Sequence, residues 1–566
     1  MSFADVLETV GSVGKFQVIH ILLLAIPVLF MASHNLLQNF VAIVPDHHCL
    51  VQFTGLNGSG QANAMGDLQT EGLLRAFIPQ DPDGQPEKCL VYSSPQWHLL
   101  NHTESWENAT ETSTRLCTEG WTYNLSKFKA TIVSEWDLVC SRKPLRQMAQ
   151  SVYMGGVLTG SIVLGWLSDR FGRRTLLLWS HFQMAVSGTC AAFSSSYPLF
   201  CFWRFLCGMA LSGIILNIFC LSLEWIPTKV RTAVSTYFNY SYTFGQLILA
   251  GMAFTIQDWR WLQFTVAAPF CIFFLSAWWF PESARWLILN NKAHVALKHL
   301  KRVAKLNNKD EEGEKLTTAI LKSSMEKELL NMKGKYSVLD LFKTPVMCKT
   351  AYCTMLVWFS TSFAYYGLAI DLQGFGVDIY LIQVIFGAVD IPAKLLGVVT
   401  LTYIGRRFTQ GTSLILAGSI IIINILIPKD TLALRTSFAA IGKGCLATAF
   451  SCCYLHAGEL YPTVVRQTGM GLVTTMARIG AMVAPVVKMT GDYVAFLPMA
   501  IYGGMAIISG IASFLLPETL NIPLPDTIEE VENRAKRRVE KDADPKKDEI
   551  PLQETLTSKA EADHLP

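Results

Sequence analysis

Long apolar stretches recur along the chain, and short polar segments separate most of them. Each is about 20 residues long, the length that an α-helix needs to cross the hydrocarbon core of a bilayer. Twelve such stretches predict twelve membrane-spanning helices, at 16–36, 146–166, 175–194, 198–220, 233–254, 260–280, 347–369, 379–400, 410–427, 433–455, 467–487 and 497–516. The pattern therefore predicts an all-α membrane protein.

The composition agrees with a membrane protein and argues against several soluble classes. Of the 566 residues, 51% are hydrophobic and only 16% are charged, whereas a soluble domain carries about 25% charged residues. The net charge of +3 is too small to indicate a nucleic-acid partner. We find no nucleotide-binding P-loop, HExxH motif or nucleophile–base pair in the sequence. We therefore expect no catalytic residues, metal or cofactor.

Lysine and arginine gather in the short loops that follow even-numbered spans. Such residues mark the cytosolic side of a membrane protein, so both termini are expected in the cytosol. The basic residues concerned are Arg170, Arg173, Arg174, Lys229, Arg231, Arg406 and Arg407. The Lys-rich stretch 285–345 should also be intracellular, and the tail 521–566, rich in Glu, Lys and Asp, is predicted to be disordered.

One loop, 41–144, is much longer than the others and is predicted to be extracellular. Its N-glycosylation sequons are at Asn57, Asn101, Asn108 and Asn124. Glycosylation requires lumenal exposure, which agrees with this placement. Its cysteines are Cys49, Cys89, Cys117 and Cys140. They can form two disulfides in an oxidising compartment, and three pairings are open.

Three motifs of the first half of the chain return in the same order in the second half. GWLSDRFGRR (165–174) returns as TYIGRRF (402–408), EWIPTKVR (224–231) as ELYPTVVR (459–466), and PESARW (281–286) as PETL (517–520). The separation between partners is nearly constant, which indicates a duplicated six-helix unit, with halves at 1–284 and 346–520. Parallel six-helix repeats describe the major facilitator fold, whose substrate site lies between the halves near the midplane.

The repeated motifs place charges of both signs at the cytosolic helix ends. They are Asp169, Arg173, Glu224, Arg231, Arg406, Glu459 and Arg466. Opposite charges there can pair when the cytosolic side is closed and part when it opens, so we expect them to act in gating. The alternative is that they only anchor helix ends, where cations suit the helix dipole.

Two cations lie deep inside predicted spans of the second half, Lys394 within VDIPAKLLG and Arg478 within TTMARIGAM. An ionisable residue at this depth is costly and indicates a functional site. For Lys394 the alternative is a structural pair with Asp390, one helical turn before it. For Arg478 the alternative is a distant acid on another helix. A midplane arginine can hold a carboxylate or sulfonate with both arms of its guanidinium, which favours anionic substrates.

Aromatic side chains are frequent in the same spans. They include Trp358, Tyr365 and Tyr366 in span seven, Tyr242 in span five, and Phe450 and Tyr454 in span ten. An aromatic residue in a span often only packs, but a buried tyrosine hydroxyl needs a hydrogen-bond partner. Together these residues predict a broad cavity that stacks on flat apolar bodies while Arg478 holds the charge.

Several longer segments match a known family. They are MASHNLLQNF (31–40), TIVSEWDLVC (131–140), LTGSIVLGWLSDRFGRR (158–174), STSFAYYGLAIDLQGFGVDIYLIQVIFGAVDIPAKL (360–395), GKGCLATAFSC (442–452) and GELYPTVVRQTGMG (458–471). Through them, nearly all of 1–530 resembles the organic anion transporters of solute carrier family 22, most of all types one and three. The resemblance implies uptake of amphipathic organic anions across the basolateral plasma membrane of kidney epithelium, in exchange for intracellular dicarboxylates such as α-ketoglutarate. It implies a cavity lined by Asn35, Tyr242, Trp358, Tyr365, Tyr366, Lys394, Phe450 and Arg478.

The chain departs from the type-one members at three cavity positions. Ile215 replaces a serine, Phe219 a methionine and Tyr454 a phenylalanine. The family links that serine to chloride beside Arg478, and Ile215 has neither donor nor acceptor, so chloride dependence is in doubt here. The substrate ranking does not transfer either, because Phe219 and Tyr454 reshape the wall. The alternatives are a urate or steroid-conjugate carrier, an uncoupled facilitator and a receptor that uses the glycosylated loop; the oligomeric state stays open.

Overall fold

The computed structural model gives the arrangement of most of the chain. It describes residues 3–11, 13–51, 74–81, 84–97, 113–227, 230–325, 338–370, 372–428, 430–462, 464–522, 524–525 and 527–543. The sequons at Asn57, Asn101 and Asn108 lie outside these residues, and so does Lys229.

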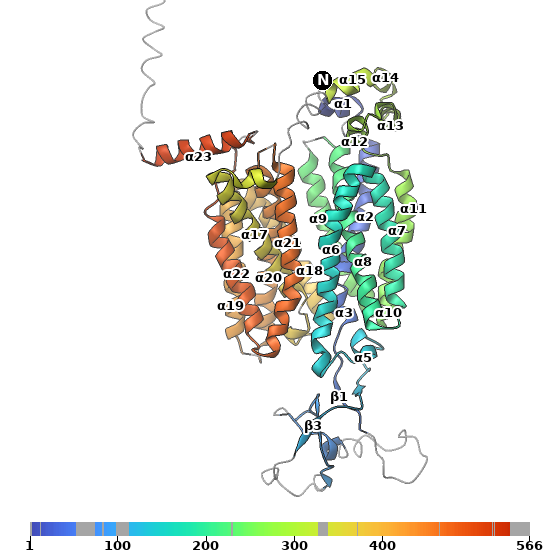
Figure 1. Ribbon diagram of the computed structural model, residues 1–566, viewed down its shortest axis with the longest axis vertical. Helices are drawn as coiled ribbons and strands as arrows, with labels where there is room; N and C mark the ends of the chain where they lie inside the picture. The colour runs from blue at the N-terminus through green and yellow to red at the C-terminus, as the bar shows by residue number, and fades with distance from the viewer. Residues whose placement is uncertain are drawn as a thin grey trace, which may run out of the picture.

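A helix or helix pair occupies each of the twelve predicted spans, and the helices form two bundles side by side (Figure 1). The first bundle holds α2 (Lys15–Leu36), α6 (Lys143–Phe171), α7 (Arg173–Ala192), α8 (Tyr197–Trp225), α9 (Arg231–Thr255) and the pair α10 (Trp259–Ala267) and α11 (Pro269–Ser276). The second holds α17 (Pro345–Ala369), α18 (Ile379–Tyr403), α19 (Arg406–Leu426), α20 (Leu432–Leu460), α21 (Arg466–Lys488) and α22 (Leu497–Ser513). Within the described residues, eight helices are long and apolar enough to cross a membrane, judged by length and composition only; α7, α9 and α17 are not among these eight, and α22 is a shorter apolar helix.

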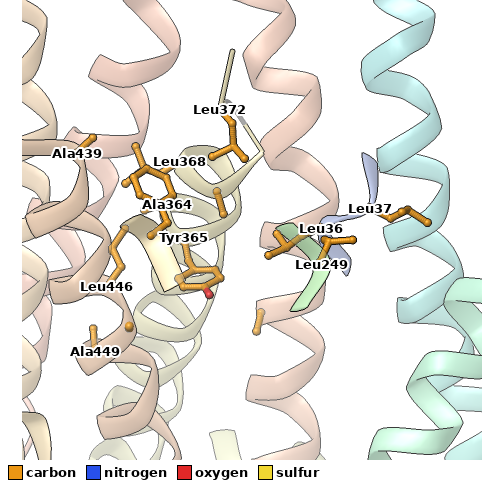
Figure 2. Packing of buried hydrophobic residues seen from close by; sticks show 14 of the residues in the cluster. Leu36, Leu37, Leu249, Ala364, Tyr365, Leu368, Leu372, Ala439, Leu446 and Ala449 are labelled. Atoms are coloured by element: carbon orange, nitrogen blue, oxygen red, sulfur yellow. The ribbon is translucent and has the colours of Figure 1, made fainter. Parts of the chain in front are cut away.

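One buried apolar cluster crosses from the first bundle to the second. Figure 2 shows Leu36 and Leu249 of the first half near Ala364 and Leu368 of α17, with Leu446 of α20 beyond them. The short helix α3 (Gln38–Val41) continues α2 into this cluster. In addition, α6 packs against α21 and α9 against α18. The halves therefore meet along two helix pairs and this cluster.

Short strands lie beyond one end of the bundles, which we call the outer end (Figure 1). Strand β1 (His47–Cys49) pairs antiparallel with β4 (Trp121–Tyr123), and β2 (Leu90–Tyr92) pairs with β3 (Thr114–Leu116). Disulfides join Cys49 to Cys117 and Cys89 to Cys140, which selects one of the three pairings that the sequence leaves open. Helix α5 (Ile132–Trp136) leads from this region back to α6.

The opposite end, the inner end, carries short helices. They are α1 (Phe3–Thr9), α12 (Ala284–Leu289), α13 (Ala293–Leu306), α14 (Asp310–Glu314) and α15 (Thr318–Ser324). Short 3₁₀ segments connect the longer elements: η4 (Cys140–Arg142), η6 (Ala277–Trp279), η7 (Val338–Phe342), η8 (Leu372–Phe375) and η9 (Met489–Asp492).

The predicted disordered tail contains a helix, α23 (Ile528–Ala543), that starts at the inner end of the second bundle and runs outward past its side (Figure 1). Ile528 and Val531 pack against the buried cluster, and Glu532 accepts the backbone N–H of Val346 at the start of α17, at 2.9 Å. The prediction of disorder is wrong for this segment. Its few apolar residues share one helix face and pack on the bundle, a contact that composition does not reveal.

The repeated glycines and acids cap two equivalent helices at the inner end. Gly172 before α7 and Gly405 before α19 have φ of +99° and +117°, which a side chain rarely adopts. In the first half, the two backbone amides that follow Gly172 donate to the carboxylate of Glu282, at 3.0 and 3.1 Å. In the second half, the two amides that follow Gly405 donate to the carboxylate of Glu518, at 2.9 and 3.0 Å. An anion at a helix N-terminus is stabilised by the free amides there. The PES and PET motifs thus do the same structural task in both halves.

The electrostatics of Glu518 show how strong this cap is. Burial raises the pKa of the carboxyl group, but the backbone amides of Arg406, Leu520, Thr519 and Arg407 favour the charged form. The amides outweigh burial and hold the pKa of Glu518 below its usual value. The capping carboxylate therefore stays charged at neutral pH.

Candidate functional site

Arg478 of α21 faces tyrosines from three other helices. Its electrostatic neighbours are Tyr153 of α6, Tyr366 of α17 and Tyr454 of α20. Within the described residues no carboxylate is among these neighbours, so the alternative of a distant acid finds no support there. No ion pair with a carboxylate therefore neutralises the guanidinium within the part of the chain that the structure describes.

The predicted aromatic residues of α17 and α20 form one continuous cluster. Trp358 meets Tyr454 edge to face at 4.5 Å between ring centroids, and Tyr365 meets Tyr366 at 5.5 Å and Phe450 at 5.6 Å. Tyr454 is 51% exposed and Trp358 only 2%. The ring of Tyr454 is therefore accessible in this conformation, whereas the ring of Trp358 is buried against it.

Asn35 of α2 positions two tyrosines of the first half. Its amide Nδ2 donates to the hydroxyl of Tyr242 at 3.2 Å, and the hydroxyl of Tyr153 donates to its Oδ1 at 3.0 Å. Because the amide of Asn35 is buried and bonded to these two hydroxyls, it holds the two rings in place. Phe219 packs edge to face on Phe238 at 5.5 Å.

Tyr153 is a residue that the sequence reasoning did not single out. It is fully buried and touches both Asn35 and the surroundings of Arg478. Its position at the contact of α6 and α21 could not be read from an apolar helix pattern. The buried hydroxyl was the available signal, since it needs a partner.

Lys394 does not pair with Asp390, although the two are one helical turn apart. Its ammonium donates to Thr243 Oγ1 at 2.7 Å and to the carbonyl of Asn239 at 3.0 Å, both on α9. Lys394 thus reaches from the second half to the first. The alternative of a structural Lys394–Asp390 ion pair is wrong in this structure, because Asp390 faces α20 instead.

The partner of Asp390 is Lys443 of α20, at 2.8 Å between Nζ and Oδ1. Both side chains are 1% exposed, and Lys443 also donates to the carbonyl of Phe386 at 3.0 Å. A buried ion pair persists only when further hydrogen bonds satisfy it. Lys443 was missed by sequence reasoning, although a lysine within an apolar span, in GKGCLATAF, is the signal used for Lys394.

Gln246 of α9 extends this ion pair across the two halves. Its Nε2 donates to Asp390 Oδ2 at 3.1 Å, and its Oε1 accepts from Lys443 Nζ at 3.4 Å. The side chain is fully buried. Gln246 therefore connects the first half to the second through hydrogen bonds between α9 and a buried ion pair.

The outer ends of the halves are also joined. Asn39 donates to the carbonyl of Ala369 at 2.9 Å, and Phe40 stacks on Tyr380 at 5.7 Å. Lys143 forms an ion pair with Asp492 at 2.5 Å. These contacts join α3 and α6 of the first half to α17, α18 and η9 of the second at the outer end.

The predicted gating charges form matching pairs at the inner end. Arg173 bonds Asp169 at 2.8 Å and approaches Glu224 at 3.6 Å. In the second half Arg406 holds Glu459 with two nitrogens, at 3.0 and 3.1 Å. Each pair lies within one half, so these pairs do not connect the halves here, and their gating role stays a prediction.

The remaining two gating candidates bond backbone carbonyls at the helix ends. Arg231 Nη2 donates to Leu223 at 3.2 Å, and Arg466 Nε donates to Tyr461 at 3.1 Å. Both therefore hold the turn that follows α8 or α20.

Comparisons with known proteins identify the fold. The family model described as "Sugar (and other) transporter" matches residues 102–531. The chain is also similar to two solved structures of the xylose transporter XylE from E. coli. The inward open form has a TM-score of 0.54 at 17% identity, over 70% of this chain and 90% of that one. The partially occluded inward open form has a TM-score of 0.55 at 14% identity, over 88% and 97%. At this identity the likeness shows the major facilitator fold.

Curated relatives match the chain over almost its full length. Solute carrier family 22 member 6-A of Xenopus laevis is 56% identical over 95% of both chains. Solute carrier family 22 member 6 of Danio rerio is 54% identical over 98% of both, and organic anion transporter 3 of Homo sapiens is 46% identical over 98% of both. The chain therefore belongs to solute carrier family 22 of the major facilitator superfamily, and it is a multi-pass membrane transporter and not an enzyme.

Proposed function

We propose that this chain is a polyspecific organic anion transporter of the plasma membrane, which exchanges extracellular amphipathic organic anions for intracellular dicarboxylates such as α-ketoglutarate by alternating access. The observation that carries the proposal is Arg478, a cation that faces tyrosines and, among the described residues, no acid. The names of the relatives are consistent with this proposal, since organic anion transporter 3 is among them.

The site chemistry suits an anion with a flat apolar body. The guanidinium of Arg478 can bind a carboxylate with two parallel hydrogen bonds. Tyr454 and Tyr366, beside it, offer ring faces for stacking and hydroxyls for further hydrogen bonds. Because aromatic stacking tolerates differences in shape, such a site would accept many organic anions.

A dicarboxylate needs a second cation, and Lys394 is the residue that we propose for it. Its ammonium bonds neutral oxygens of Thr243 and Asn239, so a direct ion pair does not cancel its charge in the described structure. Lys443, in contrast, is neutralised by Asp390. The two carboxylates of the exchanged dicarboxylate would then use Arg478 and Lys394 together.

Transport by alternating access requires the contacts at the outer end to break. We place the outer end, with the disulfide-linked strands, outside the cell and both termini in the cytosol, with sorting to the basolateral membrane in epithelium. The structure would then be closed to the outside, and the site would exchange with the cytosol. No cofactor belongs to the proposal, and Ile215 packs among apolar side chains, where it offers nothing to chloride.

Uptake of p-aminohippurate into cells that express the chain tests the proposal. Cells preloaded with glutarate should take up the anion faster than cells that are not, because an exchanger is accelerated by substrate on the opposite side. Equal uptake in both would indicate an uncoupled facilitator. Surface expression without flux of p-aminohippurate, urate or a steroid conjugate would indicate a receptor and overturn the proposal.

A further inference from the structure

An exposed tryptophan follows the lipid-facing side of α11 at the inner end of the molecule. Ile272, Leu275 and Trp278 are 67%, 67% and 62% exposed and follow one another at intervals of one turn. In a membrane protein such a stripe faces the acyl chains, and tryptophan is typical of the headgroup level. Helix α7 shares this surface, since Phe182 of α7 contacts Phe274 of α11. Trp278 therefore marks the membrane boundary at the inner end.

Arg174, at the start of α7, lies directly against Trp278. Its Nη2 donates to the carbonyl of Trp278 at 2.9 Å, and its guanidinium carbon is 5.9 Å from the ring centroid. Glu282 lies near the backbone of Arg174, but its oxygens accept the amides of α7. The cationic head of Arg174 is thus held at the height of the phospholipid headgroups.

Helix α13 brings more cations to the same place. Its apolar residues Leu300 and Val303 are buried, and its polar side carries Lys298, His299 and Arg302. Arg302 lies 5.9 Å from the ring centroid of Trp279, next to Trp278.

The neighbours of His299 show that these charges are close together. Burial and the three cations Arg174, Arg302 and Lys298 lower the pKa of His299 below its usual value. Among the described residues, no carboxylate is counted with these neighbours. Lys301 of the same helix is not part of this group of charges, because it forms an ion pair with Glu314 at 2.8 Å. Like charges gathered in this way repel one another, and an anion among the cationic side chains would relieve that repulsion.

We propose that Arg174, Lys298, His299, Arg302 and Trp278, the basic–aromatic cluster, bind the headgroup of an anionic phospholipid from the cytosolic leaflet. The cations meet the phosphate and carboxylate groups, while the acyl chains continue along Ile272 and Leu275. This continuity favours a lipid over a free anion. The cytosolic leaflet is negatively charged and attracts basic segments at its surface. The inference depends on the inner end being cytosolic, whichever anion is transported.

The test uses the purified full-length chain in nanodiscs of phosphatidylcholine, with and without phosphatidylserine. Phosphatidylserine should raise the thermal unfolding temperature of the wild type. The double variant Lys298→Ala/Arg302→Ala should lose this increase and bind a short-chain phosphatidylserine roughly 30-fold more weakly, since each cation contributes to lipid attraction. The matched control Lys305→Ala/Lys309→Ala removes two exposed charges from the same segment and should keep the increase.

Unfolding temperatures in pure phosphatidylcholine provide the check on folding, where all three chains should agree. The proposal is overturned if phosphatidylserine stabilises Lys298→Ala/Arg302→Ala as much as the wild type. It is also overturned if free phosphoserine, which lacks acyl chains, binds as tightly as the short-chain lipid.

Discussion

Gln246 offers a direct test of how the two halves are held together. Its amide joins α9 to the Asp390–Lys443 pair, with hydrogen bonds of 3.1 and 3.4 Å. Asp390 and Lys443 belong to the same half, and their own ion pair of 2.8 Å does not involve Gln246. The change Gln246→Ala therefore removes a bond between halves and leaves the ion pair in place.

The expected size of the conformational shift follows from the strength of the hydrogen bond that is lost. A hydrogen bond to a charged group contributes about 1.5–3 kcal/mol. If this contribution exists only while the halves are closed at the outer end, its loss shifts the population towards the outward-open state by roughly 10- to 160-fold. The shift requires no change in the substrate site.

The reactivity of a cysteine introduced at position 379 measures this shift towards the outward-open state. Ile379 is 7% exposed and lies in the narrow space between the halves at the outer end, next to Asn39 and Arg146. In Ile379→Cys cells, a membrane-impermeant thiol reagent should modify this cysteine at least about tenfold faster when Gln246→Ala is added, because the rate follows the open population. The chain without the added cysteine supplies the background from native thiols.

Gln263→Ala is the matched control. Gln263 is also a fully buried glutamine, but its Nε2 donates to the carbonyl of Gly188 within the first half. This change should lower stability without altering the modification rate at position 379. Equal rates in the two variants, or no acceleration by Gln246→Ala at normal surface expression, would refute the reasoning.

Four further predictions test the site and the fold. Arg478→Asp should abolish uptake of organic anions at normal surface biotinylation and Arg478→Lys should retain part of it, because an ammonium lacks the planar fork; wild-type p-aminohippurate uptake by Arg478→Asp would exclude the site. Tyr366→Ala should impair bulky aromatic anions more than small dicarboxylates, and an equal loss for both would mean that the ring only packs. Gly405→Ala should lower the thermal unfolding temperature, at a cost of about 1–3 kcal/mol for the strained backbone, since the new Cβ would lie 2.6 Å from Glu518 Oε2; Gly458→Ala, with open space around it, should not. Asn124 is exposed after β4, and Asn124→Gln should reduce the apparent mass on a gel unless the proposed topology is wrong.

Much of the architecture could be read from the sequence, because its signals are local. A stretch of apolar residues determines a membrane helix by its own length, since backbone groups must be satisfied within the segment. The repeats around Gly172 and Gly405 predicted two equivalent halves, and both glycines cap equivalent helices. The depth of Arg478 and the density of tyrosines also predicted a candidate site, which the structure brings together.

The pairing of buried charges was decided by the tertiary structure. Helix spacing allowed Asp390 to meet Lys394, yet Asp390 pairs with Lys443 and Lys394 bonds α9. The same holds for Tyr153 and Gln246, whose importance comes from the helices opposite them. Spacing along a helix states which side chains share a face, whereas the energy of a buried charge depends on which other helix meets that face and satisfies its hydrogen bonds.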